Sequence, residues 1–254
     1  MYQQKKYIQF LSKSSNQHGV HSPFVYNLIT KCFYNKTTYP AYKDLKAYRQ
    51  KLRSNKEVIT ITDLGPGSKK TKTKERRISE IAKTSGTPLK RAKLGYRLTQ
   101  YVQPEHILEL GTSLGIATQA MHLGHPQAKI TTIEGCPNCS KFTQTALADY
   151  KNIQFLTGHF SQHLNKGNQQ PWDLVFFDGN HTKEATIVYF ETLLPSAHND
   201  TIFIFDDIYW SEGMTQAWEI IKQHPQVSVT IDTFFWGFVF FRKEQRKEHF
   251  TIRI

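Results

Sequence analysis

The sequence is short of cysteine, of long apolar runs and, in its first hundred residues, of acidic side chains. Its three cysteines, Cys32, Cys136 and Cys139, exclude a disulfide-built scaffold and predict a reducing, cytoplasmic setting. No apolar stretch is long enough to cross a bilayer, and the first residues lack the apolar core of a signal peptide, so we expect no membrane association. Aromatic residues make up 13% of the chain, which argues against extended disorder.

The shortage of acids is local. Residues 1–104 hold 22 Lys and Arg against 5 Asp and Glu, whereas residues 105–254 hold 11 against 16. A basic arm before a mildly acidic domain is typical of a protein that meets an anionic partner. The densest charge lies in residues 63–77, which predict either a solvated loop or a lid that steers an anionic substrate. No aromatic residues interleave this run, which counts against a stacking surface for nucleic acid.

Apolar spacing divides the chain into two predicted parts. Residues 1–84 predict a basic helical extension, with Ser22 and Pro23 opening one of its helices and no clear strand. Residues 85–254 predict an α/β domain, because five apolar strands alternate with helices and two further strands follow almost without a loop. We therefore expect a doubly wound, mostly parallel sheet of seven strands with an antiparallel C-terminal hairpin. The expected strands span 107–111, 129–134, 153–156, 173–178, 201–206, 227–233 and 235–242.

Ligands of such sheets bind beyond the carboxyl ends of the strands. The first of these strands ends in a glycine turn that opens a helix, Glu109-Leu-Gly111-Thr112-Ser113-Leu-Gly115. Glycine lets the backbone approach a ligand, and the helix start offers free N–H groups. The second strand ends in Glu134, a carboxylate that can accept both hydrogen bonds of a ribose diol. Loop and acid together predict an adenosine nucleoside site.

These motifs resemble those of a known family. The Glu109–Gly115 turn is similar to motif I of class I S-adenosylmethionine-dependent methyltransferases, in the form common among O-methyltransferases of the catechol and caffeoyl-CoA type. The segment Asp173–His181 resembles motif IV, and Asp206-Asp207-Ile-Tyr-Trp210 resembles the Asp-Asn-x-x-Trp motif of metal-dependent members. The likeness covers about residues 85–254, while residues 1–84 resemble an extension seen in methyltransferases of Bacteroidetes-type bacteria.

The resemblance implies S-adenosylmethionine as cofactor and a set of residues that bind it. His159 stands where the family usually has an acid against the adenine, so either His159 or a backbone carbonyl makes that contact. The implied cofactor-binding residues are Glu109, Gly111, Thr112, Ser113, Gly115, Glu134, Gly135, His159 and Asp178.

A carboxylate cluster is expected at the ends of two neighbouring strands. Asp178, Asp206 and Asp207 would repel one another without a cation, and hard dications such as Mg²⁺ prefer oxygen ligands. The resemblance implies a metal site there. The alternative is that Asp178 orients substrate while Asp207 caps the turn before Ser211.

The predicted reaction is transfer of the activated methyl group to a hydroxyl of a small or mid-sized, anionic acceptor. His181 occupies the position of the family's lysine base, and an imidazole suits proton removal at neutral pH; Lys183 is the second choice. Three alternatives stay open: an RNA methyltransferase that docks through the basic arm, a non-catalytic nucleoside-binding scaffold, and an NAD-dependent oxidoreductase. The Cys136-Pro-Asn-Cys139 spacing lacks a second pair for zinc and favours a turn with incidental thiols.

Overall fold

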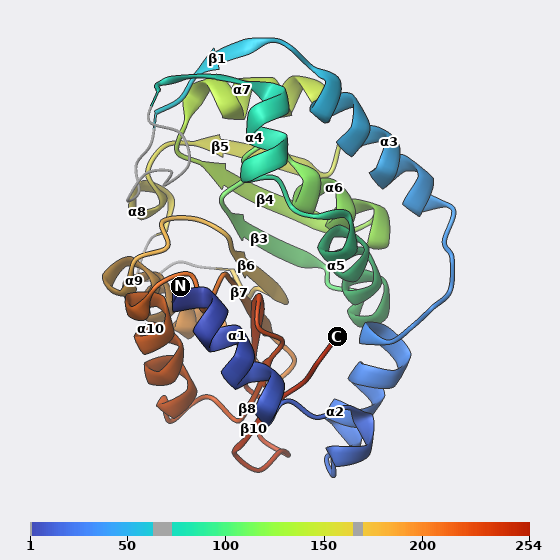
Figure 1. The fold of residues 1–254 in the computed structure, drawn as a ribbon, viewed down its shortest axis with the longest axis vertical. Helices are drawn as coiled ribbons and strands as arrows, with labels where there is room; N and C mark the ends of the chain where they lie inside the picture. The colour runs from blue at the N-terminus through green and yellow to red at the C-terminus, as the bar shows by residue number, and fades with distance from the viewer. Residues whose placement is uncertain (1, 63–72, 165–169) are drawn as a thin grey trace. The chain divides into compact units, whose positions relative to one another are not determined.

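The computed structural model describes residues 2–62, 73–164 and 170–254 (Figure 1). The chain divides into two compact units, which are described separately below. The first comprises residues 1–34, 106–108 and 164–254, and the second comprises residues 35–105 and 109–163. Among the described residues, no helix combines the length and the apolar character that a membrane crossing needs. Residues 63–72 of the predicted basic loop lie outside the described part of the chain.

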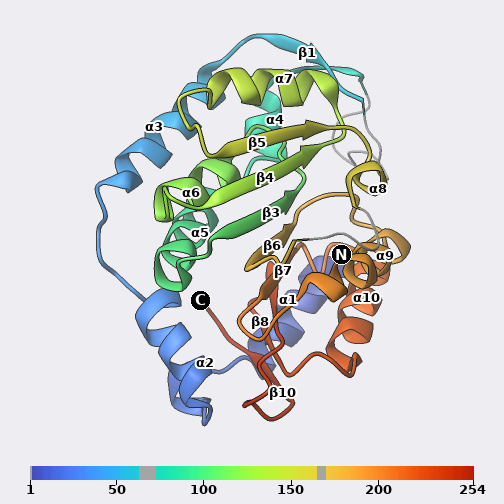
Figure 2. The same ribbon diagram turned by 180° about the vertical axis from the view of Figure 1, so that it is seen from behind.

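The second unit is built from short strands and helices that share one apolar core. Its core joins side chains of the N-terminal segment, such as Leu45 and Ile78, to side chains around the glycine turn, such as Leu114 and Leu147. Strands β4 and β5 pair in parallel, and α7 packs against both (Figure 2). The elements are α3 (Ala41–Ser54), β1 (Val58–Thr60), β2 (Glu75–Arg77), α4 (Ile78–Thr84), α5 (Leu89–Val102), the end of β3 (His106–Leu110), α6 (Ile116–Gly124), β4 (Lys129–Glu134), α7 (Pro137–Ala146), β5 (Ile153–Thr157) and α8 (Phe160–His163).

The first unit contains the chain's N-terminal helices and its C-terminal strands. Strands β6 and β7 are parallel, β9 runs antiparallel to both β7 and β8, and β10 adds in parallel to β8. Helices α9 and α10 pack side by side. The elements are α1 (Tyr2–Lys13), α2 (Pro23–Leu28), a π-helical turn (Ile29–Phe33), β6 (Leu174–Phe177), α9 (Lys183–Leu193), β7 (Ile202–Asp206), α10 (Glu212–Gln223), β8 (Val229–Asp232), β9 (Trp236–Phe240) and β10 (Glu248–Thr251), with 3₁₀ turns at Gln17–Gly19 and Leu194–Ser196.

Local sequence signals explain several helix boundaries. The Ser22 hydroxyl accepts a hydrogen bond from the Val25 N–H, and Pro23 takes the first helical position of α2, as the sequence predicts. Thr182 caps α9 and Ser211 caps α10 in the same way, through the N–H groups of Ala185 and Met214. These caps fix where the helices that follow β6 and β7 begin.

The sheet confirms the predicted fold class and corrects its strand count. Among the residues that the structure describes, its order is β10-β8-β9-β7-β6-β3-β4-β5, which makes eight strands where the sequence predicts seven. The additional strand, β10, is polar and partly exposed at the sheet edge, so it lacks an apolar pattern. Strands β1 and β2 form a separate antiparallel pair in the segment where the sequence predicts no strand. The sequence does not show them because Ile59 is the only buried residue of the pair and the others are mostly charged or exposed.

Candidate functional site

The turn after β3 adopts backbone conformations that favour glycine. Gly111 has a φ of 106° and Gly115 a φ of 71°, in the left-handed region, and Gly115 is the residue before α6. A β-carbon at Gly115 would lie 2.5 Å from Thr143 Cγ2 and 2.8 Å from Leu147 Cδ1. The Tyr48 hydroxyl donates a buried 2.8 Å hydrogen bond to the Leu114 carbonyl, a support for the turn that sequence reasoning missed.

Replacing Gly115 by alanine should therefore destabilise the second unit. Left-handed backbone costs a non-glycine residue roughly 1–2 kcal/mol, and overpacking adds to that, so we expect a loss of about 2 kcal/mol in the free energy of unfolding. Urea denaturation followed by circular dichroism measures it. Gly213→Ala is the matched control, because its β-carbon would find its nearest atom, Lys183 Cβ, at 3.4 Å. Equal midpoints for the two variants would contradict the steric argument.

Glu134, at the end of β4, is held by two backbone N–H groups. Its Oε2 accepts a 2.7 Å hydrogen bond from Ser113, and its Oε1 accepts a 2.9 Å hydrogen bond from Cys136. Each carboxylate oxygen keeps a second lone pair, so the two can still accept from a ribose diol. The structure thus brings Glu134, Gly135 and the glycine turn together, and their binding of the cofactor stays a prediction.

Glu109 and Thr112 lie in the interior below this turn. Glu109 is 0% exposed, and its Oε2 accepts hydrogen bonds from Thr118 (2.5 Å) and Thr132 (2.6 Å). Because the Thr132 proton goes to Glu109, the 2.5 Å contact between Thr112 and Thr132 has Thr112 as donor. Oε1 of Glu109 is buried without a partner among the described residues. Burial, as the largest cause, raises the pKa of Glu109 from 4.5 to about 7.

His159 lies at the start of α8. Its Nδ1 is 2.7 Å from the Ser161 hydroxyl, and its backbone N–H donates to Gln162 Oε1 at 2.8 Å. The side chain is half-buried, and its contact with adenine stays a prediction.

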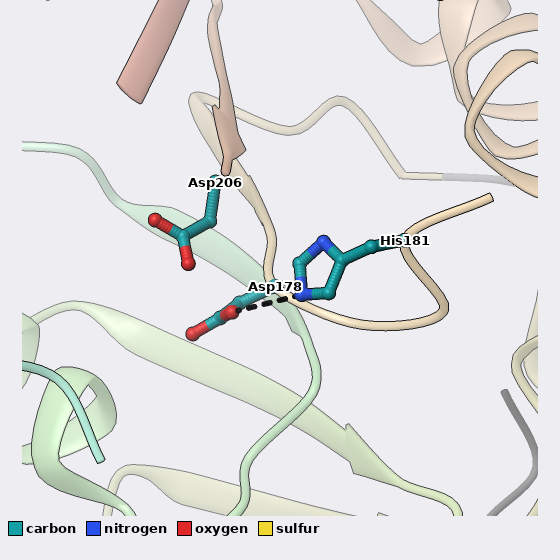
Figure 3. Close-up of side chains that lie close together, drawn as sticks. All are labelled: Asp178, His181 and Asp206. Atoms are coloured by element: carbon teal, nitrogen blue, oxygen red, sulfur yellow. Dashed lines mark ion pairs between the residues drawn. The ribbon is translucent and has the colours of Figure 1, made fainter. Parts of the chain in front are cut away.

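A cluster of two carboxylates and one imidazole lies in the first unit (Figure 3). Asp178 directly follows β6, and Asp206 is the last residue of β7. Because Phe177 pairs with Phe205 in the parallel register, both carboxylates lie at the carboxyl ends of these two neighbouring strands. His181 comes back to them through a turn in which Asn180 has a φ of 50°. One ligand atom from each residue lies within 4.8 Å of the others, and His181 Nε2 is 3.7 Å from Asp178 Oδ1.

Two further predicted residues, Asp207 and Lys183, have hydrogen bonds of their own. Asp207 has a φ of 53°, and its carbonyl accepts a 2.8 Å hydrogen bond from the Trp210 N–H; it is not in the group with ligand atoms within 4.8 Å of one another. Lys183 begins α9, and its Nζ donates to Gln216 Oε1 at 2.9 Å. The geometry puts His181 where the sequence placed a third carboxylate.

Such a cluster can hold a divalent cation or move a proton. Two neighbouring carboxylates repel each other unless a cation or a proton intervenes, and Asp206 is only 7% exposed. The imidazole can act as a ligand or as a base.

Comparisons with known proteins concern the domain and its fold. Residues 108–208 match a family model described as a methyltransferase domain. Curated protein sequences give no match. A methyltransferase from Podospora anserina, PaMTH1, solved with bound S-adenosylhomocysteine, is similar in structure, with a TM-score of 0.60, 15% identity, and coverage of 88% of this chain and 97% of its own.

Two O-methyltransferases are similar as well. The enzyme from Bacillus cereus has a TM-score of 0.53 and 17% identity, covering 82% of this chain and 94% of its own. TomG from Streptomyces achromogenes has a TM-score of 0.55 and 14% identity, covering 81% and 91%. At these identities the likenesses show the fold. The match of residues 108–208 to a methyltransferase domain agrees with the motifs around Gly111 and Glu134.

Proposed function

We propose that the chain is an O-methyltransferase that acts on a hydroxyl of a small or mid-sized, anionic acceptor with help from a divalent cation. The observation that carries the proposal is the cluster of Asp178, His181 and Asp206. Structural neighbours that are O-methyltransferases, from Bacillus cereus and Streptomyces achromogenes, support the choice of a hydroxyl.

The donor set fits a divalent cation. Asp178 and Asp206 offer carboxylate oxygens at the carboxyl ends of β6 and β7, and His181 offers a nitrogen within 4.8 Å of them. Oxygen ligands suit Mg²⁺, and a mixed oxygen and nitrogen set also suits Mn²⁺. Asp178 and Asp206 would hold the ion, and Asp207 remains a proposed further ligand. When bound, such an ion lowers the pKa of a coordinated hydroxyl and fixes its direction.

His181 is the residue we assign to proton removal from the acceptor. The neighbouring Asp178 carboxylate, 3.7 Å away, orients the ring and stabilises the imidazolium that forms. Lys183, the other candidate, directs one of its three N–H donors to Gln216 Oε1. We therefore favour His181 over Lys183.

The cofactor would bind at the glycine turn of the second unit. Glu134 would accept from the ribose hydroxyls, while Gly111 and Gly115 let the backbone approach the ligand. The sulfonium methyl group is already activated, so alignment of the acceptor oxygen supplies much of the acceleration. The basic surplus of residues 1–104 supports an anionic acceptor.

Transfer of a labelled methyl group from S-adenosylmethionine to a panel of catechols and other hydroxylated acids tests the proposal. We expect EDTA to abolish transfer, Mg²⁺ or Mn²⁺ to restore it, and Asp206→Asn to weaken cation affinity at least about tenfold. S-adenosylhomocysteine binding, measured by calorimetry, should be unchanged in that variant and serves as its folding control. Transfer that resists EDTA would remove the cation from the proposal, and label found only in RNA would remove the small acceptor.

A further inference from the structure

Two cysteines flank the first turn of α7 in the second unit. Cys136 occupies the N-cap position, with extended backbone, and Cys139 lies three residues later on the same side of the helix. The Cys139 thiol hydrogen-bonds to the Cys136 sulfur, so the two sulfur atoms already face each other. Residues of this spacing at a helix start can form a disulfide after a small adjustment.

The surroundings of the two sulfurs are unequal. The Thr62 N–H donates to Cys136 Sγ at 3.3 Å, and the N–H groups at the start of α7 face the same sulfur. These donors, with the Cys139 thiol as the largest cause, lower the pKa of Cys136 to about 5, while the same hydrogen bond and burial raise the pKa of Cys139. As a thiol, Cys136 donates to the Thr60 carbonyl at 3.6 Å, and the N–H donors around its sulfur make Cys136 the more acidic of the two cysteines.

From this placement we propose that Cys136 and Cys139 are a redox-active dithiol that a small peroxide converts to an intrachain disulfide. Cys136 attacks the oxidant and Cys139 resolves the product. Cys136 is 2% exposed and Cys139 is 5% exposed, which favours a molecule the size of hydrogen peroxide over a bulky disulfide oxidant.

The chemistry balances with hydrogen peroxide as oxidant. The Cys136 thiolate attacks one peroxide oxygen, so that an S–O bond forms, the O–O bond breaks and hydroxide leaves as water with a proton. The Cys139 sulfur then attacks Cys136; the S–S bond forms, the S–O bond breaks, and the leaving hydroxide takes the Cys139 proton to give a second water. Two thiols are oxidised by two electrons, and peroxide is reduced to two water molecules.

The segment from Cys136 to Cys139 is hydrogen-bonded to Glu134 and to strand β1, so a disulfide between the two cysteines would alter these contacts. The Cys136 N–H donates to Glu134 Oε1 at 2.9 Å, and Asn138 Nδ2, between the two cysteines, donates to the Thr60 carbonyl of β1 at 2.8 Å. A disulfide would change the torsions of Cys136 and therefore the N–H that holds Glu134. The dithiol is a property of the chain's own chemistry and does not depend on the identity of the methyl acceptor.

Peptide mapping of the folded protein after treatment with hydrogen peroxide tests the proposal, with remaining thiols blocked before unfolding. We expect a peptide linked between Cys136 and Cys139 that disappears on reduction with dithiothreitol. Cys32→Ala is the matched control, since it removes the third thiol, which is buried in the other unit, and it should leave the linkage intact.

Two further variants identify the attacking sulfur. In Cys139→Ser, dimedone should trap a sulfenic acid at Cys136, whereas in Cys136→Ser it should label Cys139 at least tenfold less. Recovery of both thiols in the wild-type protein after peroxide treatment would overturn the proposal, and this outcome needs no variant to fold. Preferential labelling of Cys139 would also overturn it.

Discussion

Replacement of His181 by alanine is expected to lower the rate of methyl transfer by about 10²–10⁴-fold, the range that a positioned general base contributes. The reason is that His181 Nε2 lies 3.7 Å from Asp178 Oδ1, within the cluster formed by Asp178, His181 and Asp206. Single-turnover transfer from labelled S-adenosylmethionine measures the loss. S-adenosylhomocysteine affinity should stay the same, because His181 lies outside the glycine turn.

His198→Ala is the matched control for this variant. His198 also pairs with an aspartate, at 3.0 Å from Asp173, but Asp173 directly precedes β6 whereas Asp178 directly follows it. Removing that imidazole should leave the transfer rate within about twofold of wild type, as surface pairs contribute little. A larger rate loss in Lys183→Ala than in His181→Ala would reassign the base to Lys183.

Replacement of Glu109 by glutamine should remove a component of stability that depends on pH. Burial raises the pKa of Glu109 from 4.5 to about 7, so the folded protein retains a proton that the unfolded chain releases. The component is therefore fully present below pH 4.5, declines as the pH rises, and is gone above about pH 7. The rise in the pKa of Glu109 corresponds to about 3 kcal/mol in the free energy of unfolding.

The measurement is the free energy of unfolding in urea at a series of pH values between these limits. Subtracting the Glu109→Gln series from the wild-type series removes the contributions of other titrating groups such as His122 and His249, whose pKa values are lowered with desolvation as the largest cause. We expect the difference to fall with rising pH, by about 3 kcal/mol in total. A difference that stays flat, or that rises, would show that Glu109 is ionised in the folded protein.

Most of the sheet could be predicted from the sequence because its central strands carry nearly continuous apolar runs. The strands around Ile107, Ile130 and Ile202 lie within a residue of their expected limits. Buried parallel strands have this composition wherever they occur, so the pattern is local. Strand β10 and the β1-β2 hairpin escaped prediction because they form by pairing at edges, with few buried side chains.

The candidate site also has features that the sequence predicts and features that only the structure shows. The positions of Glu134, Asp178 and Asp206 at strand ends, and of Gly115 before α6, follow from the motifs and from the strands that precede them. The grouping of His181 with the two carboxylates does not, because it depends on a left-handed turn at Asn180. The burial of Glu109 was equally hidden, since only its contacts with Thr118 and Thr132 show that its side chain points inward.

The sequence by itself determined the fold class, the methyltransferase motifs and the residues at the strand ends, because apolar periodicity and glycine turns act over a few neighbouring residues. Only the tertiary structure decided which of those residues meet. The distance between Asp178 and Asp206 depends on the register of β6 against β7. The acidity of the Cys136 thiol depends in part on a hydrogen bond from the Thr62 N–H, 74 positions away in the chain. Electrostatics and hydrogen bonding act through space, and they assign different chemistry to side chains of the same type.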